Sequence, residues 1–199
     1  MINLDKEKIL EIIENNNGII TNSEALKNGI SRIALHRLKE QGIINSISRG
    51  VFSLPDEIPD TLVIIQNRCK KGVFSHESAL YFHELTDRTP SKHVMTVPSN
   101  YNTTSLKDLQ VTFRYIKSNL IDLGKISMRT SQGNEVYVYD LERTICDIIR
   151  NKKSMDINEV NKAIRQYAKK SKSKYSILIM YANKLGMEKK LRDIMGVLF

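Results

Sequence analysis

Glycine divides the first fifty-four residues into segments that leave room only for short helices and strands. Asn17-Gly18, Asn28-Gly29 and Gly42 each follow a stretch that is expected to be helical, and glycine just after such a stretch is a common helix stop. The second helix is expected to begin at a cap formed by Asn22 or Ser23, because short polar side chains favour that position. The pattern predicts helices over residues 5–16, 24–27 and 31–41.

The residues between these helices have the character of strands and turns. Residues 19–21 are a β-branched run, and residues 43–48 and 51–54 flank Arg49-Gly50 as two arms of a hairpin. Helix, strand, helix, glycine-containing turn, helix and hairpin is the order of elements in a winged helix-turn-helix. The sequence therefore predicts a winged helix-turn-helix domain over residues 1–54.

The third predicted helix has one apolar side and one cationic side. Leu35 and Leu38 share the apolar side, which is expected to pack against the first two helices. Arginine on the other side can donate in pairs to guanine, a histidine can donate or accept at a base edge, and an exposed isoleucine can contact a thymine methyl group. The helix start favours a phosphate, and the hairpin tip is expected at the minor groove or the DNA backbone. The residues predicted to contact double-stranded DNA are Ser31, Arg32, Ile33, His36, Arg37 and Arg49.

Charge gives this prediction only partial support. Residues 1–54 carry 7 basic and 6 acidic side chains, a net charge of +1, whereas DNA-binding modules are usually clearly basic. A module that binds another protein through the same exposed face is therefore an alternative. Most of the acidic residues lie on the first helix, away from the proposed contact face.

A second domain is expected after a polar linker at residues 55–60. Residues 61–199 begin with helical patterns over 61–69 and from Ser75 onward. Alternating patterns and a Gln132-Gly133-Asn134 turn follow, and they predict an antiparallel sheet. The prediction is an α+β domain with a helical C-terminus. Its expected strands are residues 92–98, 111–117, 125–130 and 135–139, and its later helices are 141–151, 156–169, 175–185 and 187–198.

The positive charge of the chain is concentrated in its last quarter. Residues 150–199 carry 13 basic and 4 acidic side chains, a net charge of +9. Two interpretations stand side by side: a solvated helix end, where cations are favoured by the helix dipole, and a surface for DNA or an acidic protein partner. The residues of this basic cluster are Lys162, Arg165, Lys169, Lys170, Lys172 and Lys174.

The sequence offers no motif for catalysis, a metal or a cofactor. Its two cysteines have no partner at Cys-x-x-Cys spacing, which is typical of core residues. Its four histidines are not accompanied by the other residues of a catalytic triad or of a zinc site. Arg88 and His93 have the Arg-x4-His spacing of a group of small helical ribonucleases, but Pro90 between them argues against a helix. No apolar run approaches the ~20 residues that span a bilayer. A non-enzymatic cytoplasmic protein without cofactors or membrane partners is expected.

Two blocks of motifs together resemble a known family. The first is Gly29-Ile-Ser-Arg, Leu35-His-Arg-Leu, Gly42-Ile-Ile and Arg49-Gly-Val-Phe, and the second is Ser75-His-Glu-Ser-Ala-Leu with Asp140-Leu-Glu-Arg-Thr-Ile-Cys-Asp. Their order and separation are similar to those of AbiEi-type antitoxins, from the type IV class of abortive-infection toxin–antitoxin systems. The similarity extends over nearly the whole chain.

This resemblance implies a transcriptional autorepressor that binds inverted repeats in its own promoter. It also implies an antitoxin that counteracts a co-encoded nucleotidyltransferase-like toxin without needing a stable complex. The resemblance implies the same DNA-contacting residues that the helical pattern predicts. Arg143, Thr144 and Asp147 are expected to form an internal network at the start of a helix. A ligand-sensing winged-helix transcription factor without a toxin, and a nuclease, are the alternatives.

Overall fold

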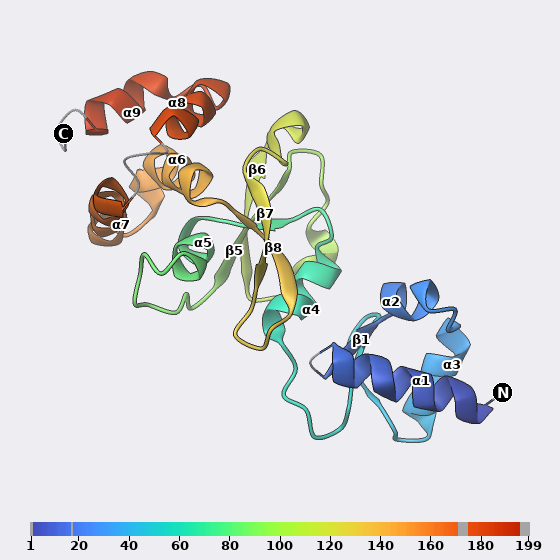
Figure 1. The fold of residues 1–199 in the computed structure, drawn as a ribbon. Coiled ribbons are helices and arrows are strands. Elements are labelled where there is room, and N and C mark those ends of the chain that lie inside the picture. Colours follow the sequence, from blue (N-terminus) through green and yellow to red (C-terminus); the bar gives the residue numbers. More distant parts are fainter. Residues whose placement is uncertain (1, 17, 171–174, 196–199) are drawn as a thin grey trace. The chain divides into compact units, whose positions relative to one another are not determined.

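The computed structural model describes residues 2–16, 18–170 and 175–195, and it confirms a mixed helix-and-sheet fold (Figure 1). The chain forms two compact units, each of which is described by itself. The first unit comprises Met1–Lys70 and Arg129–Val136, and the second comprises Lys71–Met128 and Tyr137–Phe199. Residues 55–60, the predicted linker, lie within the first unit.

The first unit follows the predicted order of elements. A three-stranded antiparallel sheet has the order β1-β3-β2, so that β3 pairs with both neighbours. The elements are α1 (Ile2–Asn15), β1 (Ile19–Thr21), α2 (Asn22–Lys27), α3 (Arg32–Glu40), β2 (Asn45–Ser48), β3 (Val51–Ser53) and α4 (Thr61–Arg68). A buried core joins the three helices α1 to α3 to this sheet, with Ile9, Leu35 and Phe52 among its members.

Side-chain caps fix where the short helices begin. The hydroxyl of Thr21 accepts a hydrogen bond from the backbone N–H of Glu24 at 3.2 Å, and the Glu24 carboxylate accepts one from the backbone N–H of Thr21 at 2.8 Å. This capping box satisfies two donors at once, so the predicted cap at Asn22 or Ser23 was wrong. Ser31 caps α3 as predicted, because its hydroxyl accepts from the N–H of Ala34 at 3.2 Å.

The second unit combines a sheet with helices at its C-terminal end. It contains β4 (Val73–Phe74), α5 (His76–Phe82), β5 (His93–Pro98), β6 (Val111–Ile116), α6 (Leu141–Asn151), α7 (Ile157–Lys170), α8 (Tyr175–Lys184) and α9 (Glu188–Met195), with short 3-10 turns η1 (Thr104–Leu106), η2 (Ser118–Leu120) and η3 (Lys152–Ser154). The strands β7 (Lys125–Arg129) and β8 (Glu135–Tyr139) complete its sheet, and the turn between them belongs to the first unit.

The five-stranded sheet is mixed, with the order β6-β5-β4-β8-β7. Strands β5 and β6 are parallel, as are β4 and β8, whereas β4 and β5 are antiparallel. The expectation of an antiparallel sheet was therefore wrong for these parallel pairs. Residues 99–110 form a crossover long enough to bring β6 beside β5 in the same direction, and the two-residue β4 is too short to show alternation.

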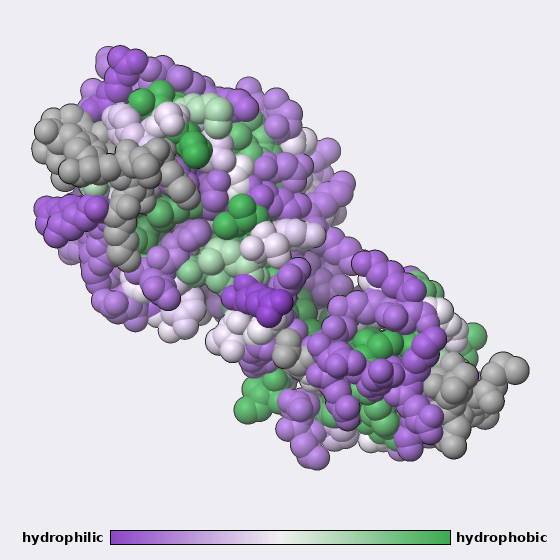
Figure 2. Space-filling view, viewed as in Figure 1, coloured by the Kyte–Doolittle hydropathy of each residue, from purple (hydrophilic) through white to green (hydrophobic). Residues whose placement is uncertain are grey.

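The helices of the second unit pack around α6. Its buried residues Ile145, Ile148 and Ile149 form one core with Tyr167 of α7 and Leu178 of α8. On the face drawn in Figure 2, hydrophilic residues predominate and hydrophobic ones form small separate patches. Within the described ranges, no helix is both long enough and apolar enough to cross a membrane.

Candidate nucleic-acid interface

Helix α3 presents its predicted contact face to solvent. Arg32, His36 and Arg37 are exposed, as is the capping residue Ser31, while Leu35 and Leu38 on the opposite side are buried. Ile33, a large apolar side chain, is 70% exposed on the same face. The face is therefore open to a partner along its whole length.

Two stripes run along this face at helical spacing. Arg32, His36 and Lys39 occupy positions i, i+4 and i+7, which lie on one side of a helix. Ile33, Arg37 and Glu40 form the parallel stripe. Lys39 is exposed and was missed by the sequence analysis, although its distance of seven residues from Arg32 is a signal that the sequence contains.

The hairpin of β2 and β3 contacts both α2 and α3. The backbone N–H of Asn22, at the start of α2, donates to the carbonyl of Gly50 at 2.9 Å. Gly50 has a φ of +77°, and a Cβ there would lie 2.8 Å from the Asn22 side chain, so only glycine fits this turn. The rings of His36 and Phe52 meet edge to face, with centroids 6.3 Å apart. Exposed Arg49 therefore lies in a turn that is anchored to α2.

Most acidic residues among residues 1–54 belong to elements other than α3. The Glu24 carboxylate is occupied in the capping box of α2, and Glu7, Glu11 and Glu14 belong to α1. Glu40 is the acidic residue of α3, and it lies on this face in the stripe with Ile33 and Arg37. The face of α3 is thus cationic even though residues 1–54 have a net charge of only +1.

This arrangement has the chemistry needed to bind duplex nucleic acid. Exposed arginine side chains can pair with the O6 and N7 atoms of guanine, and an exposed isoleucine can lie against a thymine methyl group. The N-terminus of α3 offers free backbone N–H groups and the positive end of the helix dipole to a phosphate. A short helix with one bare cationic side is also the size that enters a major groove.

The predicted basic cluster of the second unit is only partly available. Lys162 forms an ion pair with Asp87 at 2.5 Å, and this hydrogen bond raises the pKa of the lysine and lowers the pKa of the carboxyl group. Arg165 and Lys169 are exposed on α7. The Lys170 side chain, Lys172 and Lys174 lie outside the described residues.

A second group of cations was missed. The ammonium group of Lys190 donates to the carbonyl of Arg150 at 2.9 Å, and burial together with the charges of Lys152, Lys153 and Arg150 lowers the pKa of Lys190. These residues come from the end of α6, from η3 and from α9. Because the group is assembled across two distant helices, no local pattern indicates it.

The remaining histidines show no catalytic arrangement. His83 contacts the carbonyl of Tyr139 at 2.8 Å, and His93 packs edge-on against the ring of Phe74. Arg88 lies in the loop between α5 and β5 and pairs with Asp156 at 3.4 Å, so the Arg-x4-His spacing is not on a helix. Among the described residues, no three His, Cys, Asp or Glu side chains are grouped to hold a metal ion.

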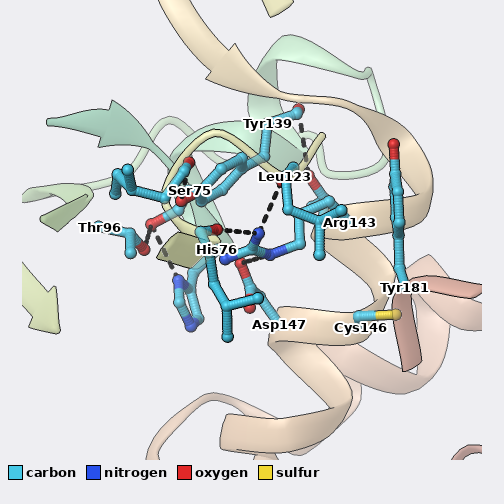
Figure 3. A network of polar contacts seen from close by, with 12 residues as sticks. Ser75, His76, Thr96, Leu123, Tyr139, Arg143, Cys146, Asp147 and Tyr181 are labelled. Atoms are coloured by element: carbon cyan, nitrogen blue, oxygen red, sulfur yellow. Dashed lines mark hydrogen bonds and ion pairs between the residues drawn. The ribbon is translucent and has the colours of Figure 1, made fainter. Parts of the chain in front are cut away.

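The second motif block forms an internal network around Arg143 (Figure 3). The Arg143 side chain is fully buried: its Nε donates to Asp147 at 3.1 Å, and its Nη1 donates to the carbonyls of Leu120 and Leu123 at 3.0 and 2.7 Å. The guanidinium group lies 4.0 Å from the centre of the Tyr139 ring. This network ties the segment before β7 to α6, which is the structural role predicted for Arg143 and Asp147.

The backbone around this network is adapted to it. Asp140 caps α6 by accepting from the N–H of Arg143 at 2.8 Å, and its other oxygen accepts from the hydroxyl of Tyr181 at 2.8 Å. The hydroxyl of Thr144 donates to the carbonyl of Asp140 at 2.7 Å. A Cβ at Gly124, whose φ is +76°, would lie 2.6 Å from the Cβ of Arg143, so that the close approach also requires glycine.

A second chain of contacts adjoins the first and centres on His76. The side-chain N–H of Asn151 donates to Nε2 of His76 at 2.9 Å, so Nδ1 carries the proton and donates to the hydroxyl of Ser75 at 2.9 Å. The hydroxyl of Thr96 also donates to that of Ser75. Burial lowers the pKa of His76 to about 4, against the opposing charge of Asp147, so the imidazole is neutral in the fold.

Comparison with known proteins finds a family similarity for part of the first unit. Residues 7–55 match the model of a family described as "Transcriptional regulator, AbiEi antitoxin", whereas no curated protein matches the chain. Among solved structures, the chain is similar to the RV2827C protein from Mycobacterium tuberculosis, with a TM-score of 0.49 and 10% identity over 94% of this chain and 79% of that chain. A likeness at that level defines neither fold nor function. The family match spans the region from α1 to β3, so this N-terminal region is similar to AbiEi antitoxin transcriptional regulators.

Proposed function

We propose that this protein is a DNA-binding autorepressor and antitoxin of a type IV abortive-infection system, and that it acts in the cytoplasm. Residues 1–54 serve as a winged helix-turn-helix that binds inverted repeats in the promoter of its own operon. The single observation that carries the proposal is the bare face of α3, where Arg32, His36 and Arg37 are exposed and Ile33 is 70% exposed.

In this proposal α3 enters the major groove. Arg32 and Arg37 read guanine edges, His36 donates or accepts at a base edge, and Ile33 contacts a thymine methyl group. Ser31 holds a phosphate at the helix N-terminus, and Arg49 touches the minor groove or the backbone from the hairpin tip. Binding at inverted repeats blocks transcription by occupying the operator.

The C-terminal domain, residues 61–199, counteracts a co-encoded toxin that resembles a nucleotidyltransferase. A type IV antitoxin need not form a stable complex with its toxin, so a dedicated toxin-binding helix is not required. The exposed cations Arg165 and Lys169 on α7 either contact DNA that flanks the operator or meet an acidic partner. A ligand-sensing transcription factor without a toxin is the alternative.

The DNA-binding half is tested by gel shift with the full chain. The probe is the DNA upstream of its own gene, and the competitor is the same fragment with its inverted repeats scrambled. We expect specific binding to be lost in the double variant Arg32→Ala/Arg37→Ala and retained in Arg129→Ala, which removes an exposed arginine from β7. Undiminished operator affinity in the double variant would contradict the assignment of α3.

The antitoxin half is tested by co-expression with the neighbouring gene. That gene is expected to arrest growth when it is expressed alone from a foreign promoter and to be tolerated when this chain is present. The double variant should still protect, because it leaves the C-terminal domain intact. Growth unaffected by the neighbouring gene would favour the ligand-sensing alternative.

A further inference from the structure

The second unit contains a pocket of about 670 Å³ that the proposed function does not use. It is lined by the start of α5, the loop from Thr86 to Lys92, the beginnings of β5 and β6, and the connection from η3 to α7. Its volume lies within the range of small-molecule sites. Hydroxyl, charged and apolar side chains share its wall.

Two charged side chains of this pocket have buried atoms that lack partners. Within the described part of the chain, Nε of Arg114 and Oε2 of Glu77 are buried and make no hydrogen bond. An unpaired buried atom of a charged group is costly, and native proteins contain few of them. Both residues also line the pocket, so a ligand that offers an acceptor to the Arg114 guanidinium group and a donor to the Glu77 carboxylate would meet two charged groups that are incompletely paired within the chain.

The other acidic side chains of the pocket are already engaged. Asp156 pairs with Arg88 and accepts from the N–H of Asn158, and Glu159 accepts from the hydroxyl of Thr86 at 2.6 Å. Arg114 therefore remains available to an anionic group, as does exposed Lys92 beside it in the pocket wall. Glu77 is the acid left to receive a donor.

Arg114 is linked to His76 by a chain of hydrogen bonds, and Glu77 follows His76 in the sequence. Nη2 of Arg114 donates to the hydroxyl of Ser154 at 3.0 Å, and that hydroxyl donates to the carbonyl of Asn151. Asn151 in turn donates to His76, the residue directly before Glu77. His76 has a φ of +50°, a conformation that a residue with a side chain seldom adopts without a reason. Arg114 is thus positioned by a chain of hydrogen bonds that ends at the buried His76.

We infer that this pocket binds a small molecule that carries an anionic group, which pairs with Arg114 and Lys92, and a hydrogen-bond donor, which pairs with Glu77. Nucleoside monophosphates and free amino acids share this chemistry. Leu80, Val94 and Met155 supply the apolar part of the wall. The inference concerns the second unit alone and does not depend on DNA binding by α3.

Thermal unfolding of the full chain in the presence of three sets of probes tests the inference. The probes are the nucleoside monophosphates, the free amino acids and inorganic phosphate, each at millimolar concentration, and any shift is followed by a direct titration. A ligand that binds the native state raises the midpoint of unfolding in proportion to its saturation. We expect one of the first two sets to do so and to exceed the effect of phosphate.

Two variants localise the effect. Glu77→Gln and Arg114→Met should each weaken binding about tenfold or more, the usual consequence of removing a charged hydrogen-bond partner. Lys92→Met removes an exposed cation of the loop without touching the buried contacts, and it should weaken binding by a smaller factor even if Arg114→Met fails to fold. Arg129→Met is the matched control and should bind as the unaltered chain does.

Three outcomes would overturn the inference. The first is no shift with any probe. The second is binding that survives in Glu77→Gln and in Lys92→Met. The third is an effect of phosphate alone that equals that of the best organic probe, since this would indicate an adventitious anion and no use of Glu77.

Discussion

Helices α6 and α3 carry arginine side chains in opposite environments: Arg143 of α6 is buried, whereas Arg32 and Arg37 of α3 are exposed. Arg143 is fully buried and donates to Asp147 and to two backbone carbonyls. Arg32 and Arg37 are exposed on a helix whose other side is buried. A guanidinium group that is buried and bound through Nε and Nη1 stabilises the fold, whereas one left in water remains available for recognition.

The largest expected effect is a loss of stability when the buried Arg143 is replaced. Arg143→Met leaves Asp147 as an unpaired buried charge and should reduce the free energy of unfolding by about 3–5 kcal/mol. Urea denaturation followed by circular dichroism measures the loss. Arg32→Met, the matched change on α3, should alter stability by no more than about 0.5 kcal/mol. Similar losses in both variants would show that burial does not separate the two regions.

A double substitution sharpens the same comparison. Because most of the loss comes from the abandoned carboxylate, Arg143→Met combined with Asp147→Leu should be less destabilising than the sum of the two single changes. Additive losses would mean that the two side chains act independently.

The next effect concerns the buried histidine beside that network. The pKa of His76 is about 4 in the fold and 6.5 in the unfolded chain, so the unfolded chain binds more protons between these values. Stability is therefore complete above pH 6.5 and falls by up to about 3 kcal/mol as the pH drops toward 4. Urea denaturation across this range measures the slope.

Asparagine offers a non-titrating replacement that tolerates a positive φ. His76→Asn should flatten the decline between pH 6.5 and 4, and His36→Asn, on the exposed face of α3, should leave it in place. A decline that persists unchanged in His76→Asn would assign it to other groups.

A smaller effect is expected on the exposed side. Arg32→Ala and Arg37→Ala should each weaken operator binding by about 1–3 kcal/mol if the side chain pairs with a base, with an unchanged urea midpoint. Fluorescence anisotropy on operator and scrambled DNA measures the affinity. Equal losses on both DNAs would indicate phosphate contacts instead of base recognition.

The smallest expected effect is at the hairpin tip. If Arg49 contacts the DNA backbone, Arg49→Gln should weaken operator and scrambled DNA alike and reduce the slope of log affinity against log salt by about 1. Titrations at several salt concentrations measure that slope. A loss confined to the operator would indicate that Arg49 reads bases in the minor groove.

Prediction from sequence succeeded where the signal is local. The start of α3 at Ser31 follows from one polar side chain, and the order of elements from α1 to β3 follows from helical spacing and glycine positions. The cap of α2 was misassigned because the reciprocal bonds of Thr21 and Glu24 compete with simpler caps. Lys39 was overlooked although its spacing from Arg32 was readable.

Prediction failed where elements distant in the sequence meet. The parallel pairing of β4 with β8 joins Phe74 to Val138, and alternation along a strand carries no information about the direction of its neighbour. The cations around Lys190 and the pocket between Glu77 and Arg114 are assembled in the same way, from segments that no motif connects.

The amino-acid sequence alone determined which side of α3 is cationic, because the helical repeat places residues i, i+4 and i+7 together whatever surrounds them. Only the tertiary structure decided that this side stays bare while Arg143 is enclosed, since burial depends on which distant segments pack against a helix. The carbonyls of Leu120 and Leu123 accept hydrogen bonds from Arg143, which is 23 and 20 residues away in the sequence. No short-range pattern in the sequence predicts these contacts.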